Sequence, residues 1–266
     1  MSGSGIPVFV VDAFAERPFA GNPAAICRFE RWPEPALLLA IAAEMNLSET
    51  AFIVGGDGRY EIRWFTPTRE VDLIGHATLA AGLVVFDRLE PGRDRVEFRS
   101  GAETLAVRRD GDLLAMDFPA LRSTSSPDKA RIAATLGSLP IELLSAKHYL
   151  AVFEHAGAVR DLAPDMAAVA ALDLPAVIAT APGDRAGVDF VSRFFAPANG
   201  VPEDPVSGVA HLALVPYWAA RLGRKRLVGE QLSRRGGRVI GIDEGERVTL
   251  SGKAVLVLEG RLYPTG

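Results

Sequence analysis

Three ionisable residues, Glu49, His76 and Asp204, have the side-chain types that general acid–base chemistry requires. A carboxylate beside an imidazole, with a second carboxylate available, can remove a proton from one carbon and return it to another. Each residue also has a simpler interpretation. Glu49 could be a helix-turn cap or a surface acid, and Asp204 could be the N-cap of the helix that follows it. A single histidine such as His76 is more often structural than catalytic.

Glycines before two apolar helical segments are a second chemical signal. Gly75 and Gly208 each stand at the expected start of such a segment. Helix starts present unpaired N–H groups and a positive dipole end, so they attract anions, and a glycine lets a ligand approach this backbone closely. The pattern predicts a carboxylate held between the two helix starts. The alternative is that both glycines only permit tight packing of helix on strand.

The two glycines belong to a repeat that runs through the chain. Four segments recur in the same order. They are residues 63–68 with 193–198, Gly75 with Gly208, residues 77–80 with 210–213, and residues 98–101 with 233–237. This order predicts a duplicated domain.

Each copy is predicted to consist of strands that enclose one helix, which is an α+β fold. Alternating and β-branched residues predict the strands, and an apolar surface nearly all round predicts that the helix over 78–89 is enclosed. The predicted strands are 8–14, 51–54, 60–65, 95–98, 104–108 and 113–117, then 149–154, 176–179, 190–195, 238–242, 248–251 and 254–258. The other predicted helices are 35–44 and 210–222. The predicted domains are 1–119 and 127–266, with a terminal strand free to cross between them.

Composition limits the classes of function. The chain has 266 residues, a net charge of -4 and 48% hydrophobic residues, which fits two globular domains and argues against a nucleic-acid-binding protein. The one cysteine, Cys27, cannot form an internal disulfide and fits a reducing compartment. The start of the chain lacks the apolar core of a signal peptide, and no apolar run approaches a membrane span of about 20 residues. We therefore expect a cytoplasmic protein without a membrane partner.

Motifs along nearly the whole chain together resemble the phenazine-biosynthesis isomerase (PhzF-like) family. The motifs lie at residues 11–14, 19–24, 45–52, 63–67, 75–80, 203–211, 235–237 and 248–255. The resemblance implies the diaminopimelate-epimerase-like fold, with two pseudo-symmetric domains in which a strongly curved, mostly antiparallel sheet wraps a central helix. It also implies a homodimer.

The resemblance implies a function as well: a cofactor-independent isomerase that moves a proton between carbons of a small carboxylate, with its acid/base residue in a cleft between the two predicted domains. Glu49 falls on the family's single acid/base residue, and His76 and Asp204 fall on its catalytic partners. Other matched positions line the substrate pocket, namely Ser48, Gly75, Ser207, Gly208 and Val209. No cofactor or metal is required by this chemistry.

Two departures from the family pattern lie in that pocket. Many members have cysteine where this chain has Ile74, and many have a serine where it has Val209. Val209 cannot donate a side-chain hydrogen bond to a substrate carboxylate, although its backbone N–H remains available. Both changes make the pocket more apolar, so the substrate need not be the phenazine precursor.

Two alternative functions have to be considered for such a fold. Racemases that use one thiol on each side of the substrate are excluded, because the only cysteine is Cys27. A non-catalytic carboxylate-binding or regulatory protein would keep the cleft without turnover. The joint presence of Glu49, His76 and Asp204 argues against it, since binding alone does not require all three.

Overall fold

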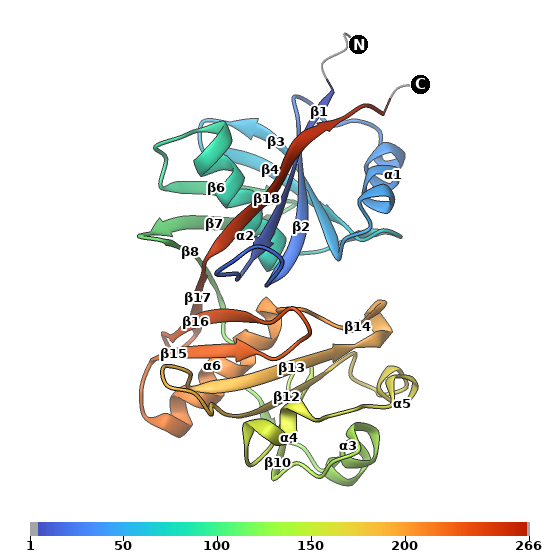
Figure 1. Cartoon of the computed structure of the whole chain (residues 1–266), viewed down its shortest axis with the longest axis vertical. Coiled ribbons are helices and arrows are strands. Elements are labelled where there is room, and N and C mark those ends of the chain that lie inside the picture. Colours follow the sequence, from blue (N-terminus) through green and yellow to red (C-terminus); the bar gives the residue numbers. More distant parts are fainter. Residues whose placement is uncertain (1–4, 265–266) are drawn as a thin grey trace. The chain divides into compact units, whose positions relative to one another are not determined.

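The protein is described by a computed structural model that covers residues 5–264. The polar start, where the sequence predicts a flexible end, lies almost wholly outside that range. The chain divides into two compact units (Figure 1). One unit runs to Met116 and is completed by the segment that begins at Ser251, and the other runs from Asp117 to Leu250.

The first unit is a mixed, mostly antiparallel sheet around helix α2. Its strands are β1 (Ile6–Ala13), β2 (Asn22–Phe29), β3 (Glu49–Gly56), β4 (Arg59–Phe65), β5 (Glu70–Val71), β6 (Arg95–Ser100), β7 (Glu103–Asp110), β8 (Leu113–Pro119) and β18 (Ala254–Leu262). They pair in the order β18, β1, β2, β3, β4, β6, β7 and β8, and only β2–β3 and β4–β6 are parallel. The last strand of the chain thus completes the unit that the first strand begins.

Helix α2 (Gly75–Val84) is buried from His76 to its end. It continues into a π-helical turn at Val85–Leu89. Helix α1 (Pro35–Met45) buries Leu38, Ile41 and Ala42. An apolar helix inside a curved sheet buries hydrophobic surface all round, which explains why the sequence of α2 has no polar face.

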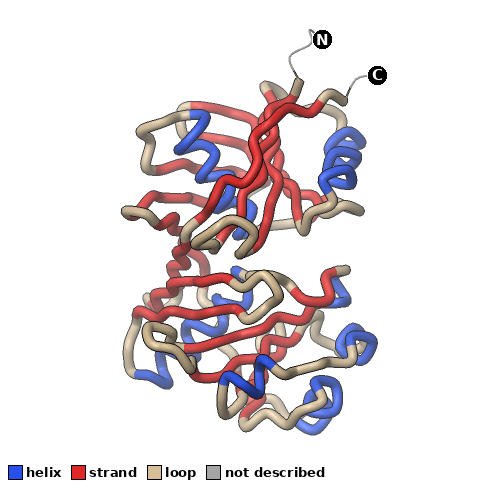
Figure 2. The backbone as a smooth tube through the Cα atoms, in the orientation of Figure 1, coloured by secondary structure: helices blue, strands red, loops and turns tan. Residues whose placement is uncertain are grey.

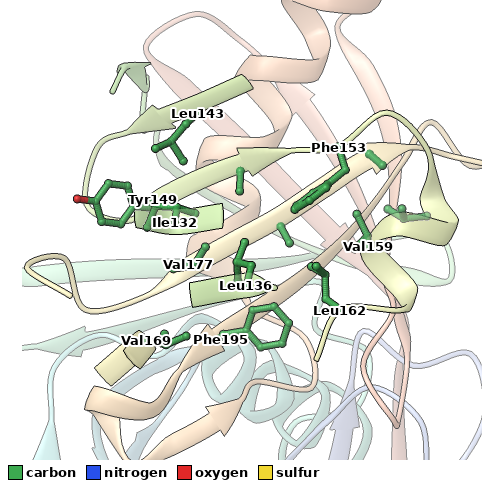
Figure 3. Packing of buried hydrophobic residues seen from close by; sticks show 14 of the residues in the cluster. Ile132, Leu136, Leu143, Tyr149, Phe153, Val159, Leu162, Val169, Val177 and Phe195 are labelled. Carbon is green, nitrogen blue, oxygen red and sulfur yellow. The ribbon is translucent and has the colours of Figure 1, made fainter. Parts of the chain in front are cut away.

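The second unit has its own core. Its strands are β9 (Thr124–Ser125), β10 (Glu142–Ser145), β11 (Tyr149–Val152), β12 (Val177–Pro182), β13 (Phe190–Ala196), β14 (Val201–Glu203), β15 (Arg226–Gln231), β16 (Gly237–Asp243) and β17 (Arg247–Gly252). Its helices are α3 (Lys129–Leu136), α4 (Ala156–Arg160), α5 (Met166–Ala170) and α6 (Gly208–Leu222), with a 3₁₀ turn at Pro197–Asn199. Figure 2 shows helices on both sides of these strands. One apolar cluster joins α3, α4 and α5 to β11–β13 through residues such as Ile132, Val159 and Phe195 (Figure 3).

The two units repeat the same pairing scheme. In each, an antiparallel pair is followed by a parallel pair, another antiparallel pair, and a parallel strand that enters after the central helix. An arginine–glutamate pair recurs as well: Arg63 binds both carboxylate oxygens of Glu70 at 2.6 Å, and Arg193 binds those of Glu203 at 2.7 and 2.9 Å. The predicted fold class, two similar α+β units with a sheet around a helix, is confirmed.

Element bounds differ from the prediction in a few places. The central helices begin at Gly75 and Gly208, two to three residues earlier than predicted, and α2 gives way to a π turn before residue 89. Strands β5, β9, β10, β14 and β15 and helices α3, α4 and α5 were not predicted. Short amphipathic helices of five to eight residues carry little periodic signal. Within residues 5–264, no helix is long and apolar enough to cross a membrane.

Candidate active site

Three side chains of the first unit meet at the start of α2. Nε2 of His76, the second residue of α2, lies 3.2 Å from Oε2 of Glu49, the first residue of β3. Nδ1 of the same ring lies 3.4 Å from Nδ2 of Asn22, the first residue of β2. The side chains of His76 and Glu49 are only 7% and 13% exposed. Two strand starts and one helix start thus bring together a carboxyl group, an imidazole and an amide.

The imidazole of His76 is neutral. Its distance to Glu49 would suit an ion pair, but burial lowers the pKa of His76 from 6.5 to about 3, so the ring carries no charge at neutral pH. An amide nitrogen can only donate, so Nδ1 accepts from Asn22 and the ring proton lies on Nε2, toward Glu49. The N–H is close to the carboxyl group without the alignment of a hydrogen bond. The Nε2 proton is therefore not bound by Glu49 in this arrangement.

The backbone at the start of α2 is not closed by a side chain. The residue before the helix, Ile74, makes no side-chain cap, although Thr78 donates from its hydroxyl to the Ile74 carbonyl at 2.7 Å. The first N–H groups of a helix have no partner within the helix. Ser48 lies next to Glu49 and is half-buried, as is Gly75. The start of α2 thus presents backbone donors beside the Glu49–His76 pair.

Helix α6 begins differently, in the second unit. Its N-cap is Ser207, whose hydroxyl accepts from the Ala210 N–H at 3.3 Å, so the interpretation of Asp204 as the N-cap is wrong. An N-cap is the residue directly before the first helical residue, here Gly208, and Asp204 lies three residues before that position. His211 adds a bond from Nδ1 to the Ser207 carbonyl, at 2.7 Å. Asp204 is half-buried, and its N–H donates to the Phe194 carbonyl at 3.0 Å.

Packing does not explain the glycine at the start of α6. A Cβ atom placed on Gly208 meets no atom within 4 Å. By contrast, one placed on Gly82, in the middle of α2, would lie 2.6 Å from Val107, so that glycine is needed for close packing. Val209 beside Gly208 is only half-buried. The open space next to Gly208 therefore favours the interpretation that its backbone is kept accessible.

The first unit's trio has no chemical counterpart in the second. The strand ladders place Phe65 and Phe195 at equivalent positions, and Gly75 and Gly208 begin the equivalent helices. These matches make three further pairs of positions equivalent: Glu49 with Ala176, His76 with Val209, and Asn22 with Ala146. A carboxyl group, an imidazole and an amide thus occupy these positions in one unit, and small apolar groups occupy them in the other.

Other polar features do not coincide with this trio. A hollow of about 220 Å³ in the second unit is lined by Glu203, Pro205, Ser233, Arg234 and Arg235. A hollow of about 570 Å³ in the first unit is lined mainly by charged residues that include Arg28, Arg88, Glu90 and Arg93. Among residues 5–264, no three His, Cys, Asp or Glu side chains are grouped so that they could hold a metal ion.

The thiol of Cys27 is an inert core group. The residue lies in β2 with no exposed surface, and burial raises its pKa to about 12. A thiolate is the reactive form of cysteine, so this thiol is not a proton carrier at neutral pH.

Two residues of the site escaped the sequence analysis. Asn22 lies in one of the recognised motifs, but its contact with His76 depends on two elements that are 54 residues apart. Gln231 is 1% exposed and binds the backbone of the loop before α6. The alternation of residues along β15 gives a weak signal for Gln231. It places Leu227, Gly229 and Gln231 on the buried face of the strand, where a glutamine side chain needs hydrogen-bond partners.

Known proteins resemble this chain over nearly its whole length. The model of a family described as phenazine biosynthesis-like protein matches residues 11–260. An uncharacterized isomerase of Pseudomonas aeruginosa is 48% identical over 258 residues, which cover 97% of this chain and 99% of that protein. A PhzF family phenazine biosynthesis protein of Enterococcus faecalis, known from a crystal structure, is 41% identical with a TM-score of 0.94, covering 97% and 99% of the two chains.

More distant structures share the fold class alone. The crystal structure of a probable proline racemase from Agrobacterium radiobacter, with bound carbonate, matches with a TM-score of 0.59 at 8% identity. The match covers 98% of this chain and 93% of that one. The fold is therefore common to proteins whose sequences have diverged almost completely.

Proposed function

Because the chain belongs to the phenazine biosynthesis-like protein family, whose relatives and fold support an isomerase or epimerase, we propose that it moves a proton between two carbons of a small carboxylate, with Glu49 as the single acid and base. The observation that carries this proposal is the Asn22–His76–Glu49 contact at the start of α2. The replacement of all three by apolar residues in the second unit supports chemistry with one base.

The proposed reaction conserves every atom. The Glu49 carboxylate takes a proton from one carbon, and the electron pair left behind is delocalised into the neighbouring unsaturated system. The protonated Glu49 then returns the proton to a second carbon of that system, on the same face. Substrate and product are isomers, and the glutamate ends as the carboxylate with which it began.

His76 has a supporting role in this proposal. Its neutral ring presents an N–H near Glu49, and such a donor can stabilise negative charge as it develops on the substrate. Asn22 keeps the ring in this tautomer, because its amide donates to the opposite nitrogen. A protonated imidazole would instead hold the Glu49 carboxylate in an ion pair and make it a weaker base.

The second unit is proposed to bind the substrate carboxylate. The N–H groups at the start of α6 and the open space beside Gly208 suit an anionic group, and Val209 contributes backbone but no side-chain donor. Asp204 precedes this start and is proposed as a second acidic group of the machinery. The positions of Ser48 and Gly75 beside Glu49 and His76 fit a role in lining the pocket.

Deuterium exchange tests the proposal. The protein is incubated in deuterated water with cyclic and acyclic carboxylates, dihydro-hydroxyanthranilate among them, and carbon-bound deuterium or isomerisation is followed by NMR. We expect exchange with at least one compound and a loss of about 100- to 10,000-fold in Glu49→Gln. Glu61→Gln, which alters an exposed glutamate of the same unit, is the matched control.

Two outcomes would contradict the proposal. Exchange that survives in Glu49→Gln would mean that another group is the base. If the protein binds several of the carboxylates but exchanges none, it is instead a binding or regulatory protein of the same fold.

A further inference from the structure

The loop between β14 and α6, residues 204–207, is tied down by side chains from outside it. It leaves the sheet before the helix begins, so its backbone polar groups need other partners. Gln231, the last residue of β15, supplies two. Its Oε1 accepts from the Ser207 N–H at 2.9 Å, and its Nε2 donates to the Asp204 carbonyl at 2.6 Å. One buried amide therefore binds both ends of this short loop.

A second side chain, that of Ser233 in the turn between β15 and β16, also binds this loop. The hydroxyl of Ser233 donates to the Pro205 carbonyl at 2.7 Å and accepts from the Gly236 N–H at 3.1 Å. His211 adds its bond to the Ser207 carbonyl. The backbone that leads into α6 is thus fixed at Asp204, Pro205 and Ser207.

The first unit has no glutamine at the position equivalent to Gln231. Its equivalent loop, residues 71–74, also lies between a glutamate and a helix-starting glycine, and has the same length. The ladders place Ser100 where the second unit has Gln231, and a serine is too short to span such a loop. The Thr78 hydroxyl binds this loop's backbone, at the Ile74 carbonyl. Leu73 is instead 38% exposed.

We propose that Gln231 is a positioning residue, whose amide fixes the orientation of the first N–H groups of α6 for the carboxylate of the substrate. This inference rests on the proposed function. A donor that binds an anion is most effective when its direction is set in advance, because no free energy is then spent on ordering it during binding. A glutamine is suited to this task, since it offers one acceptor and one donor in a rigid plane.

The test compares Gln231→Leu with Thr180→Val. Leucine has a similar size but neither hydrogen bond. Thr180 is equally buried in the same unit; its hydroxyl donates to the Val191 carbonyl and accepts from the Trp218 ring N–H, and neither partner belongs to the loop. Benzoate is the probe, a cyclic carboxylate whose Kd is measured by NMR titration. Amide hydrogen exchange is measured at Ser207, and kcat and KM are measured for the compound that exchanges fastest.

We expect Gln231→Leu to bind benzoate about tenfold more weakly and to raise KM more than it lowers kcat, while amide exchange at Ser207 accelerates at least tenfold. Thr180→Val should leave Kd and KM unchanged even if it lowers the free energy of unfolding as much as Gln231→Leu does. Should Gln231→Leu not fold, Ser233→Ala removes the second contact, and a smaller rise in the benzoate Kd is expected.

The outcomes separate this inference from the proposed function. Unchanged benzoate affinity in folded Gln231→Leu overturns the positioning role, whether or not the wild-type protein turns over. Weakened affinity in that variant supports the role, even if the wild-type protein proves unable to exchange any carbon-bound proton. The latter result would contradict the proposed isomerase alone.

Discussion

The two units begin their central helices in ways that are alike in the backbone and different in the side chains. In both first turns, a side chain four residues after the cap position donates to the cap carbonyl at 2.7 Å, from Thr78 in α2 and from His211 in α6. The cap itself differs. Ser207 closes the start of α6 with its hydroxyl, whereas Ile74 offers no side-chain cap to α2.

This difference shows how a duplicated scaffold can divide one task. The first unit has the trio at the start of α2, and it has Ser100 at the position equivalent to Gln231. The second has apolar residues at the trio's positions and a loop held by Gln231 and Ser233. In the function we propose, the first unit moves the proton and the second holds the anion.

The largest expected effect comes from giving the first unit the residues of the second. We expect Glu49→Ala to lower the rate of exchange about 1,000-fold, His76→Val about 100-fold and Asn22→Ala about tenfold. In the proposed function Glu49 carries the proton, His76 stabilises the negative charge that develops on the substrate, and Asn22 fixes only the tautomer of His76. Deuterium incorporation followed by NMR gives the three rates. An Asn22→Ala variant slower than Glu49→Ala would reverse the assigned roles.

The sequence was sufficient for the fold class and for three of the four repeated segments. The fourth pairing, 98–101 with 233–237, is out of register, because the ladders make Ser100 equivalent to Gln231 and the turn that follows is longer in the second unit. Glu49 and His76 are 27 positions apart, and only the meeting of a strand start with a helix start explains their contact. Asn22 and Gln231 act through contacts 54 and 24 to 27 positions away, and neither has a local pattern that names its partner. The glycine at the start of α2 was recognised, but the predicted helical range began three residues later, because Ile74 and Gly75 carry no capping signal.

The next largest expected effect is the pH dependence of the free energy of unfolding. Burial lowers the pKa of His76 to about 3 and that of His211 to about 4, so both rings are neutral in the folded protein. The unfolded chain takes up these protons once the pH falls below about 6.5, so stability is complete above that value and is lost as the pH falls toward 4. Each ring adds at most about 1.4 kcal/mol per pH unit to the slope of the unfolding free energy.

The variant His211→Thr isolates the contribution of the second unit. Threonine is the residue of the first unit at this position, where Thr78 makes the same bond to the cap carbonyl. Urea unfolding between pH 4 and pH 7 should show a slope smaller by about 1.4 kcal/mol per pH unit, whatever the loss of stability at pH 7. An unchanged slope would mean that folding does not lower the pKa of His211.

Two glycines distinguish a packing role from a binding role. Gly82→Ala places a methyl group against Val107 and should cost about 1–3 kcal/mol of stability, with little effect on benzoate affinity. Gly208→Ala adds its methyl group to open space and should change stability by less than about 0.5 kcal/mol, while it weakens benzoate binding. Thermal unfolding and NMR titration measure the two effects. Normal benzoate affinity in Gly208→Ala would remove the start of α6 from the proposed site.

The smallest expected effect is that of the cap. Ser207→Ala removes the hydroxyl that accepts from the Ala210 N–H, and we expect the first turn of α6 to lose about 1 kcal/mol of protection against amide hydrogen exchange. Ser207→Thr keeps an acceptor and should lose little. Because Gln231 binds the Ser207 N–H and His211 binds its carbonyl, both variants should keep the turn in place. Equal protection in Ser207→Ala and the wild type would mean that these two side chains alone hold the start of α6, and that the missing cap of α2 is not what distinguishes the two helices.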